Sequence, residues 1–143
     1  HMRDHGGSIR VHCRRGPGIS IAERTIDWDS FKNKIEHFSQ ALLREVNEKP
    51  YIVMLGAPAK ACTLIHQTGI EDRISYAVDN TPQKVNRYIA GTKIKILDEK
   101  TLTDSKSEKT LLLSAWNYED VFRKKYPQYD FIVPFKPRQR LAA

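Results

Sequence analysis

The stretch Tyr51-Ile-Val-Met-Leu-Gly-Ala-Pro-Ala-Lys60 decides the fold. An apolar run leads into a glycine turn, and the helical pattern of residues 58–68 follows and ends at Gly69. A strand, a tight glycine turn and a helix bring backbone N–H groups and a helix N-terminus to one spot, which favours phosphate or another anion. The sequence therefore predicts a strand–turn–helix unit that handles an anionic small molecule.

The glycine turn keeps only part of the dinucleotide-binding pattern Gly-x-Gly-x-x-Gly. Gly56 stands at the middle position, whereas Met54 and Ala59 replace the outer glycines, and Pro58 has no N–H to offer a phosphate. Three interpretations stay open. They are a standard dinucleotide site, a modified anion or sugar-nucleotide contact to which Lys60 adds a cation, and a purely structural turn with Pro58 at the first helical position.

Strand-like and helical segments alternate along the rest of the chain. We predict strands at 51–55, 74–78, 94–96, 110–114 and 130–133, and helices from an Asp27 cap to 47, over 58–68, and from an Asn117 cap to 125. Strands this apolar indicate a mostly parallel sheet covered on both faces. The expected fold is a Rossmann-like three-layer α/β sandwich with strand order 3-2-1-4-5, preceded by a strand at 8–13 and the first helix.

The composition argues against several classes of function. A chain of 143 residues suits one domain, and its net charge of +7 comes from scattered bases without a nucleic-acid recognition motif, so no nucleic-acid partner is expected. No apolar run is long enough to span a membrane. Two cysteines fit a reducing, cytoplasmic setting. The histidines lack metal-ligand spacing and no catalytic motif is present, so we assign no catalytic or metal residue.

Polar residues follow two of the predicted strands. Asp79 ends the second strand at a distance from Gly56 that suits the acid that binds a ribose hydroxyl, and it equally suits a cap of the next turn. Trp116 and Asn117 follow the fourth strand. Trp116 is either a stacking surface for a base or sugar or a core residue, and Asn117 either binds hydroxyls or caps a helix.

Several motifs, taken in order, resemble the C-terminal domain of S-adenosylmethionine-dependent sugar C-methyltransferases. These are Gly56-Ala57-Pro58-Ala59-Lys60, Thr63-Leu64, Gly69-Ile70, Val78-Asp-Asn80-Thr-Pro-Gln-Lys84, Arg87-Tyr88, Gly91-Thr92, Ile94, Ala115-Trp-Asn117 and Ile132-Val-Pro134. His5-Gly-Gly-Ser-Ile-Arg10 resembles the segment that leaves the methyltransferase domain. The family's turn commonly reads Gly-Tyr-Gly-Ala-Pro-Ala-Lys-Gly, so Met54 and Ala61 depart from it.

The resemblance implies one part of a larger enzyme. In that enzyme a zinc-binding domain and an S-adenosylmethionine-binding domain precede a Rossmann-like domain that helps to hold a nucleotide-linked keto-deoxysugar. The enzyme removes a proton beside the keto group and methylates the resulting carbanion. This chain would bind neither zinc nor S-adenosylmethionine, would be inactive alone, and would have the nucleotide-sugar and the upstream methyltransferase domain as partners. Residues 1–2 are interpreted as a tag remnant, 3–18 as the segment leaving the upstream domain, and 19–143 as the Rossmann-like domain.

The resemblance also implies a set of substrate contacts. These are expected at Gly56, Ala57, Pro58, Ala59, Lys60, Asp79, Asn80, Lys84, Tyr88, Trp116 and Asn117, with His5 near the domain junction. Two alternatives to a methyltransferase domain stay open, namely a free-standing nucleotide-binding, NAD-binding or regulatory module and a structural interaction domain.

Overall fold

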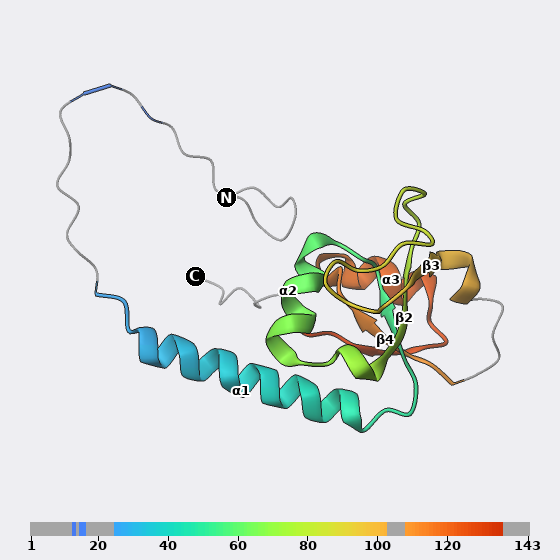
Figure 1. Cartoon of the computed structure of the whole chain (residues 1–143), viewed down its shortest axis with the longest axis horizontal. Coiled ribbons are helices and arrows are strands. Elements are labelled where there is room, and N and C mark those ends of the chain that lie inside the picture. Colours follow the sequence, from blue (N-terminus) through green and yellow to red (C-terminus); the bar gives the residue numbers. More distant parts are fainter. Residues whose placement is uncertain (1–12, 14, 17–24, 103–107, 136–143) are drawn as a thin grey trace.

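A five-stranded parallel sheet forms the centre of the protein. The computed structural model describes residues 13, 15–16, 25–102 and 108–135 (Figure 1). The strand order is β3-β2-β1-β4-β5, and each neighbouring pair is parallel. The strands are β1 (Ile52–Leu55), β2 (Ile74–Asp79), β3 (Ile96–Asp98), β4 (Thr110–Leu113) and β5 (Asp130–Ile132). The predicted sheet and its order are confirmed, whereas the strand predicted at 8–13 lies, apart from Cys13, outside the described residues.

In the part of the chain that the structure describes, three α-helices cover the sheet and three short 3-10 helices lie in the connections. The α-helices are α1 (Trp28–Asn47), α2 (Ala59–Thr68) and α3 (Glu119–Lys125), and the 3-10 helices are η2 (Glu71–Arg73), η3 (Glu99–Leu102) and η4 (Trp116–Tyr118). As predicted, Asp27 caps α1, because its carboxylate accepts the Ser30 N–H at 2.9 Å. Gly69 ends α2 with φ 67°, a conformation that glycine adopts without a Cβ penalty.

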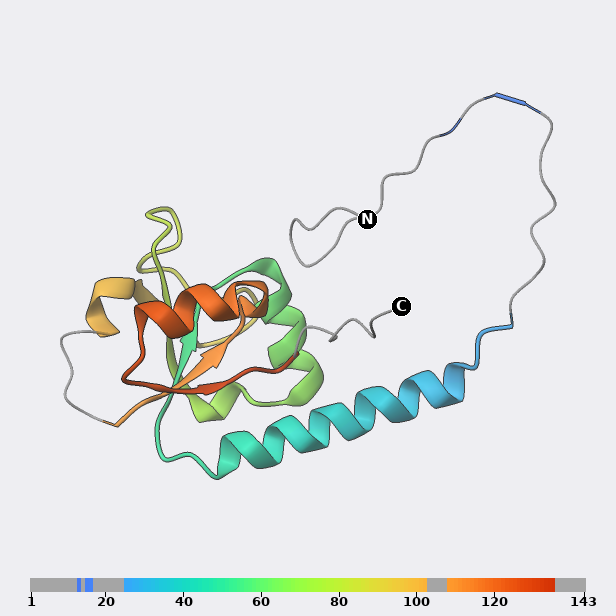
Figure 2. The same cartoon turned by 180° about the vertical axis from the view of Figure 1, so that it is seen from behind.

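The inner strands β1 and β4 are buried at every position because both faces of the sheet are covered (Figures 1 and 2). Alternate residues of β1 point to opposite faces. Ile52 and Met54 belong to the cluster that includes α1 and α2, whereas Val53 and Leu55 belong to the cluster on the α3 side. This alternation produces the three-layer arrangement that the sequence predicts.

Helix α1 is buried only toward its C-terminal end. Leu42 and Val46 are buried against the core, whereas Trp28 and Phe31 at its start are exposed and meet edge to face at 6.2 Å. Figure 1 shows the start of α1 extending beyond the sheet. Among the described residues, no helix has both the length and the apolar character needed to cross a bilayer.

The third strand differs from the prediction. Residues 94–96 were the expected strand, but pairing with β2 extends over Ile96–Asp98. The reason is a local fold-back, in which the Ile96 N–H donates to the Arg87 carbonyl at 2.7 Å and the Ile89 N–H donates to the Ile94 carbonyl at 3.0 Å. This segment, residues 86–96, therefore lies antiparallel to itself before the chain enters the sheet.

Two helix starts also differ from the prediction. Pro58 is the residue before α2, with φ −73° and ψ 162°, and is not the first helical residue. Helix α3 begins at Glu119 with Tyr118 before it, because the chain first makes the 3-10 turn η4 after Ala115. Asn117 lies inside that turn and does not cap α3.

Candidate functional site

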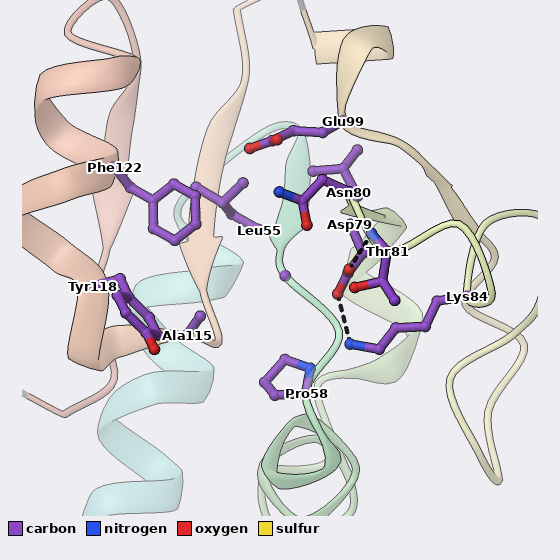
Figure 3. A pocket seen from close by; sticks show the side chains of 12 residues that line it. Leu55, Pro58, Asp79, Asn80, Thr81, Lys84, Glu99, Ala115, Tyr118 and Phe122 are labelled. Atoms are coloured by element: carbon purple, nitrogen blue, oxygen red, sulfur yellow. Dashed lines mark hydrogen bonds and ion pairs between the residues drawn. The ribbon is translucent and has the colours of Figure 1, made fainter. Parts of the chain in front are cut away.

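A cavity of about 230 Å³ opens at the carboxyl ends of the strands (Figure 3). Its residues come from the ends of β1 and β2 and from the segment after β4, on both sides of the point where the strand order changes direction. Ligands of open parallel sheets bind at this switch point. The lining of this switch-point cavity is Leu55, Gly56, Pro58, Val78, Asp79, Asn80, Thr81, Lys84, Glu99, Ala115, Tyr118 and Phe122.

Asp79 organises one wall of the switch-point cavity. Its Oδ2 accepts the Ala57 N–H at 2.9 Å and the Lys84 ammonium at 3.0 Å, and its Oδ1 accepts the Thr81 N–H at 2.9 Å. The Asp79 side chain is only 9% exposed. A buried carboxylate is stable in such a position because hydrogen-bond donors surround it.

The donors around Asp79 control its ionisation. Burial of the carboxyl acts to raise its pKa, but hydrogen bonds from Thr81, the Ala57 N–H and Lys84 outweigh that effect and lower the pKa of Asp79 to about 2. Asp79 is therefore a fixed negative charge at neutral pH. Asp79 caps the Asn80–Thr81 turn, as one of the two sequence interpretations predicts, and it also lines the cavity.

The glycine turn is tied to the neighbouring strands. Gly56 has φ 86°, and a Cβ at this position would lie 3.3 Å from the Ala115 Cβ. The Gly56 N–H donates to the Val78 carbonyl at 2.8 Å. The buried Ser114 hydroxyl donates to the Gly56 carbonyl at 2.7 Å and lies 3.1 Å from the Leu55 carbonyl. Hydrogen bonds from the Ser114 side chain and from the backbone therefore fix the conformation of the turn.

The opposite wall of the switch-point cavity is aromatic (Figure 3). Tyr118 and Phe122 project from η4 and α3, on the side away from Lys84. Glu99 closes the end of the cavity, where it is paired with the Lys125 ammonium at 2.8 Å. Burial and the Glu99 carboxylate raise the pKa of the adjacent Tyr126 to about 12. Aromatic faces beside carboxylates suit a ring that carries hydroxyl groups.

A second, more basic cavity of about 190 Å³ adjoins the first. We call it the basic cavity, because Lys84 and Arg87 line it and no carboxylate does. Pro58 and Lys84 belong to both cavities. The lining of the basic cavity is Ala57, Pro58, Ala59, Cys62, Lys84, Arg87, Tyr88, Ile89, Ala90 and Ile96.

The structure gathers most of the predicted site residues around these two cavities. Gly56, Pro58, Asp79, Asn80 and Lys84 line the switch-point cavity. Ala57, Ala59 and Tyr88 line the basic cavity. His5 lies outside the described residues.

Three predicted site residues lie apart from both cavities. The Lys60 ammonium is 3.8 Å from the centroid of the Trp116 ring, and burial lowers the pKa of Lys60. Trp116 also contacts Phe135 at 4.6 Å between ring centroids and packs against the core cluster of α1 and α2. The structure therefore favours the core interpretation of Trp116. Asn117 is exposed and lines neither cavity.

Sequence reasoning missed several cavity residues. Tyr118 and Phe122 are spaced by one helical turn after the fourth strand, and that spacing was available as a signal. Glu99 gave no such signal, because it begins the short 3-10 helix η3, and Arg87 stands in the quoted motif Arg87-Tyr88 but was not assigned to the site. Ser114 is the one hydroxyl at the end of an apolar strand, which could have marked it as a partner of the turn.

The described residues do not fit a zinc ion or a cofactor cradle. Within ranges 25–102 and 108–135 and the few described residues before them, no three His, Cys, Asp or Glu side chains gather as a metal site requires. The amides of Gly56 and Ala57, which would approach a cofactor, already donate to Val78 and Asp79. Pro58 contributes no N–H.

Comparison with known proteins confirms the family that the sequence motifs resemble. No curated protein matches the chain. A family model described as C-methyltransferase C-terminal domain matches residues 21–134, a range that contains every strand of the sheet and both cavities. By this match, the chain belongs to the family of C-methyltransferase C-terminal domains.

Proposed function

We propose that this domain holds a nucleotide-linked keto-deoxysugar for an S-adenosylmethionine-dependent C-methyltransferase. The methyl donor, the zinc ion and the residues that move protons belong to upstream domains of the full-length enzyme, so this domain alone is inactive. The upstream methyltransferase domain is its partner, and the setting is cytoplasmic. Family membership supplies the reaction class.

The observation that carries the proposal is the switch-point cavity. It combines the Asp79 and Glu99 carboxylates with the aromatic rings of Tyr118 and Phe122 at the carboxyl edge of the sheet. Carboxylates accept hydrogen bonds from sugar hydroxyls, and aromatic rings cover the apolar face of a sugar or base. The same arrangement disfavours NAD, because the turn amides that would meet its diphosphate already have partners.

The test is a titration of the isotope-labelled domain with UDP- and dTDP-linked hexoses, in which NMR measures the amide chemical shifts at each ligand concentration. The proposal expects shifts at Gly56, Asp79, Asn80 and Tyr118, and no heat on mixing with S-adenosylmethionine in calorimetry. Trp116 and Asn117, which lie off the cavity, are expected to shift little. The absence of shifts with every nucleotide-sugar would count against the proposal, and tight NAD binding would favour a nucleotide-binding module.

A second arm of the test removes the cavity's aromatic wall. Phe122 is half-buried in the switch-point cavity, whereas Val121, next to it on α3, is 59% exposed. The Phe122→Leu variant should weaken nucleotide-sugar binding by roughly tenfold, the scale of one lost stacking contact. The matched Val121→Ala variant should bind as the wild type does.

A further inference from the structure

Charge is divided between the two sides of the Pro58 turn. The switch-point cavity carries two carboxylates, Asp79 and Glu99, and one cation, Lys84, which pairs with Asp79. The basic cavity carries Lys84 and Arg87 and no carboxylate. An anionic group and a neutral hydroxylated ring would therefore prefer different sides of Pro58.

The Gly56 turn, where a Rossmann fold ordinarily places phosphate, is closed to it here. The Ala57 N–H points at Asp79 Oδ2 at 2.9 Å, and the Gly56 N–H points at the Val78 carbonyl at 2.8 Å. Asp79 is ionised at neutral pH, so a phosphate at this turn would lie beside a carboxylate and would find both turn amides already bonded. Asp79 thus takes the place of the anion that the turn would otherwise attract.

Arg87 is the cation that is free to meet a phosphate. It makes no ion pair with another described residue, whereas Lys84 already pairs with Asp79 at 3.0 Å. The backbone at Arg87 is fixed, because its carbonyl accepts the Ile96 N–H at 2.7 Å and Asn86 before it holds φ 65°. A guanidinium on a fixed backbone suits bidentate contact with phosphate oxygens.

The sizes of the two cavities also favour a ligand that occupies both of them. Volumes of about 230 Å³ and about 190 Å³ are each below the range of cavities that enclose a ligand as large as a nucleotide-sugar. Since Pro58 and Lys84 line both cavities, a single ligand can extend across them.

We infer that the phosphates of the ligand bind in the basic cavity against Arg87 and Lys84, while its neutral hydroxylated ring occupies the switch-point cavity. This inference rests on the proposed function for the identity of the ligand. It assigns the phosphate subsite to the β3 side of Pro58 and removes it from the Gly56 turn.

The experiment uses inorganic diphosphate as the probe, titrated into the labelled domain at low salt. Amide shifts are expected at 84–90 and at Ala59, with little change at Gly56 and Thr81. The Arg87→Gln variant should weaken diphosphate binding by about tenfold, and Arg87→Lys should restore part of it. The matched control is Lys124→Gln, which removes one exposed charge from α3 and lines neither cavity. It should bind diphosphate almost as the wild type does.

The outcomes separate this inference from the proposed function. Shifts centred on Gly56 and Thr81, equal losses in Arg87→Gln and Lys124→Gln, or no diphosphate binding would each overturn the subsite assignment. Nucleotide-sugar binding could still be observed in those cases, and the proposed function would then stand without the assignment. Conversely, if diphosphate binds at Arg87 but nucleotide-sugars bind no more tightly than diphosphate, the subsite stands and the proposed function fails.

Discussion

The Asp79 carboxylate accepts the backbone N–H of Ala57 at 2.9 Å, across a separation of 22 residues in the chain. The bond joins the end of β2 to the turn after β1, and Lys84 meets the same carboxylate oxygen at 3.0 Å. One side chain of the protein therefore fills the position at which related folds receive a ligand's anion.

Replacing Asp79 with Asn should destabilise the fold. Asparagine keeps the shape but loses the charge, and its amide nitrogen must face one of the donors that the carboxylate now accepts. We expect the free energy of unfolding, measured by urea denaturation at pH 7, to fall by about 2–3 kcal/mol. Asp72→Asn, at an exposed carboxylate, is the control and should change it by less than about 0.5 kcal/mol. Equal effects in both variants would contradict this role for Asp79.

The same carboxylate makes stability depend on acid. The pKa of Asp79 lies at about 2 in the folded protein and at its ordinary value of 3.8 in the unfolded chain. The stabilisation is therefore complete above pH 3.8 and is lost as pH falls toward 2, to a total of up to about 2 kcal/mol. Urea denaturation of the wild type and Asp79→Asn between pH 5 and pH 2 should show their difference shrinking over this window. A difference that stays constant would exclude Asp79 as the titrating group.

Replacing Gly56 with alanine should lower the free energy of unfolding through backbone strain and through crowding. The Gly69→Ala variant separates the two effects. Gly56 has φ 86° and a Cβ there would lie 3.3 Å from the Ala115 Cβ, whereas Gly69 has φ 67° with open space around it. Gly69→Ala should lower the free energy of unfolding by about 1 kcal/mol through backbone strain alone. Gly56→Ala should lower it further, by about 1–2 kcal/mol more, because of the added crowding. Thermal unfolding of both variants measures the difference, and equal losses would show that the turn has room for a Cβ.

Lys109 is a position where a substitution should stabilise the protein. Its ammonium nitrogen is buried, has no hydrogen-bond partner among the described residues, and lies 6.0 Å from the centroid of the Tyr76 ring. Lys109→Met keeps the length of the side chain and removes the unmet polar group, so we expect the free energy of unfolding to rise by about 1–2 kcal/mol. Lys124→Met, on the exposed face of α3, should leave it nearly unchanged. A loss of stability in Lys109→Met would show that the ammonium has a partner in solution.

The fold could be predicted from sequence because its main signals are local. Strand β1 is apolar at every position and β4 at three of its four, and Asp27 and Gly69 mark helix ends through contacts within one turn. The third strand was misplaced because residues 94–96 first pair with 86–89, and an apolar pattern does not show which partner a short segment takes.

The candidate site was predictable only in part. Asp79 and the Gly56 turn lie at strand ends, whose position follows from the sheet order. The partners that decide their chemistry are remote in sequence, as with Lys125, which meets Glu99 across 26 residues. The 3-10 turn η4 after β4 places Tyr118 at the cavity and packs the half-buried Trp116 against the core cluster of α1 and α2, and the sequence pattern does not show which of these neighbouring aromatic side chains faces which way. A cap prediction at Asn117 assumes a regular helix there and does not anticipate that turn.

The fold-back of residues 86–96 has a consequence for self-association. A sheet's outer strands present unpaired amides and carbonyls on which another chain can add a strand. On the β3 side, Asn86 and Arg87 already use the Ile96 backbone, so the start of that border is covered from within the chain. On the other side β5 is three residues long and begins at Asp130, which faces Lys49 at 3.6 Å. Both borders of the sheet therefore discourage the strand addition that leads to aggregation.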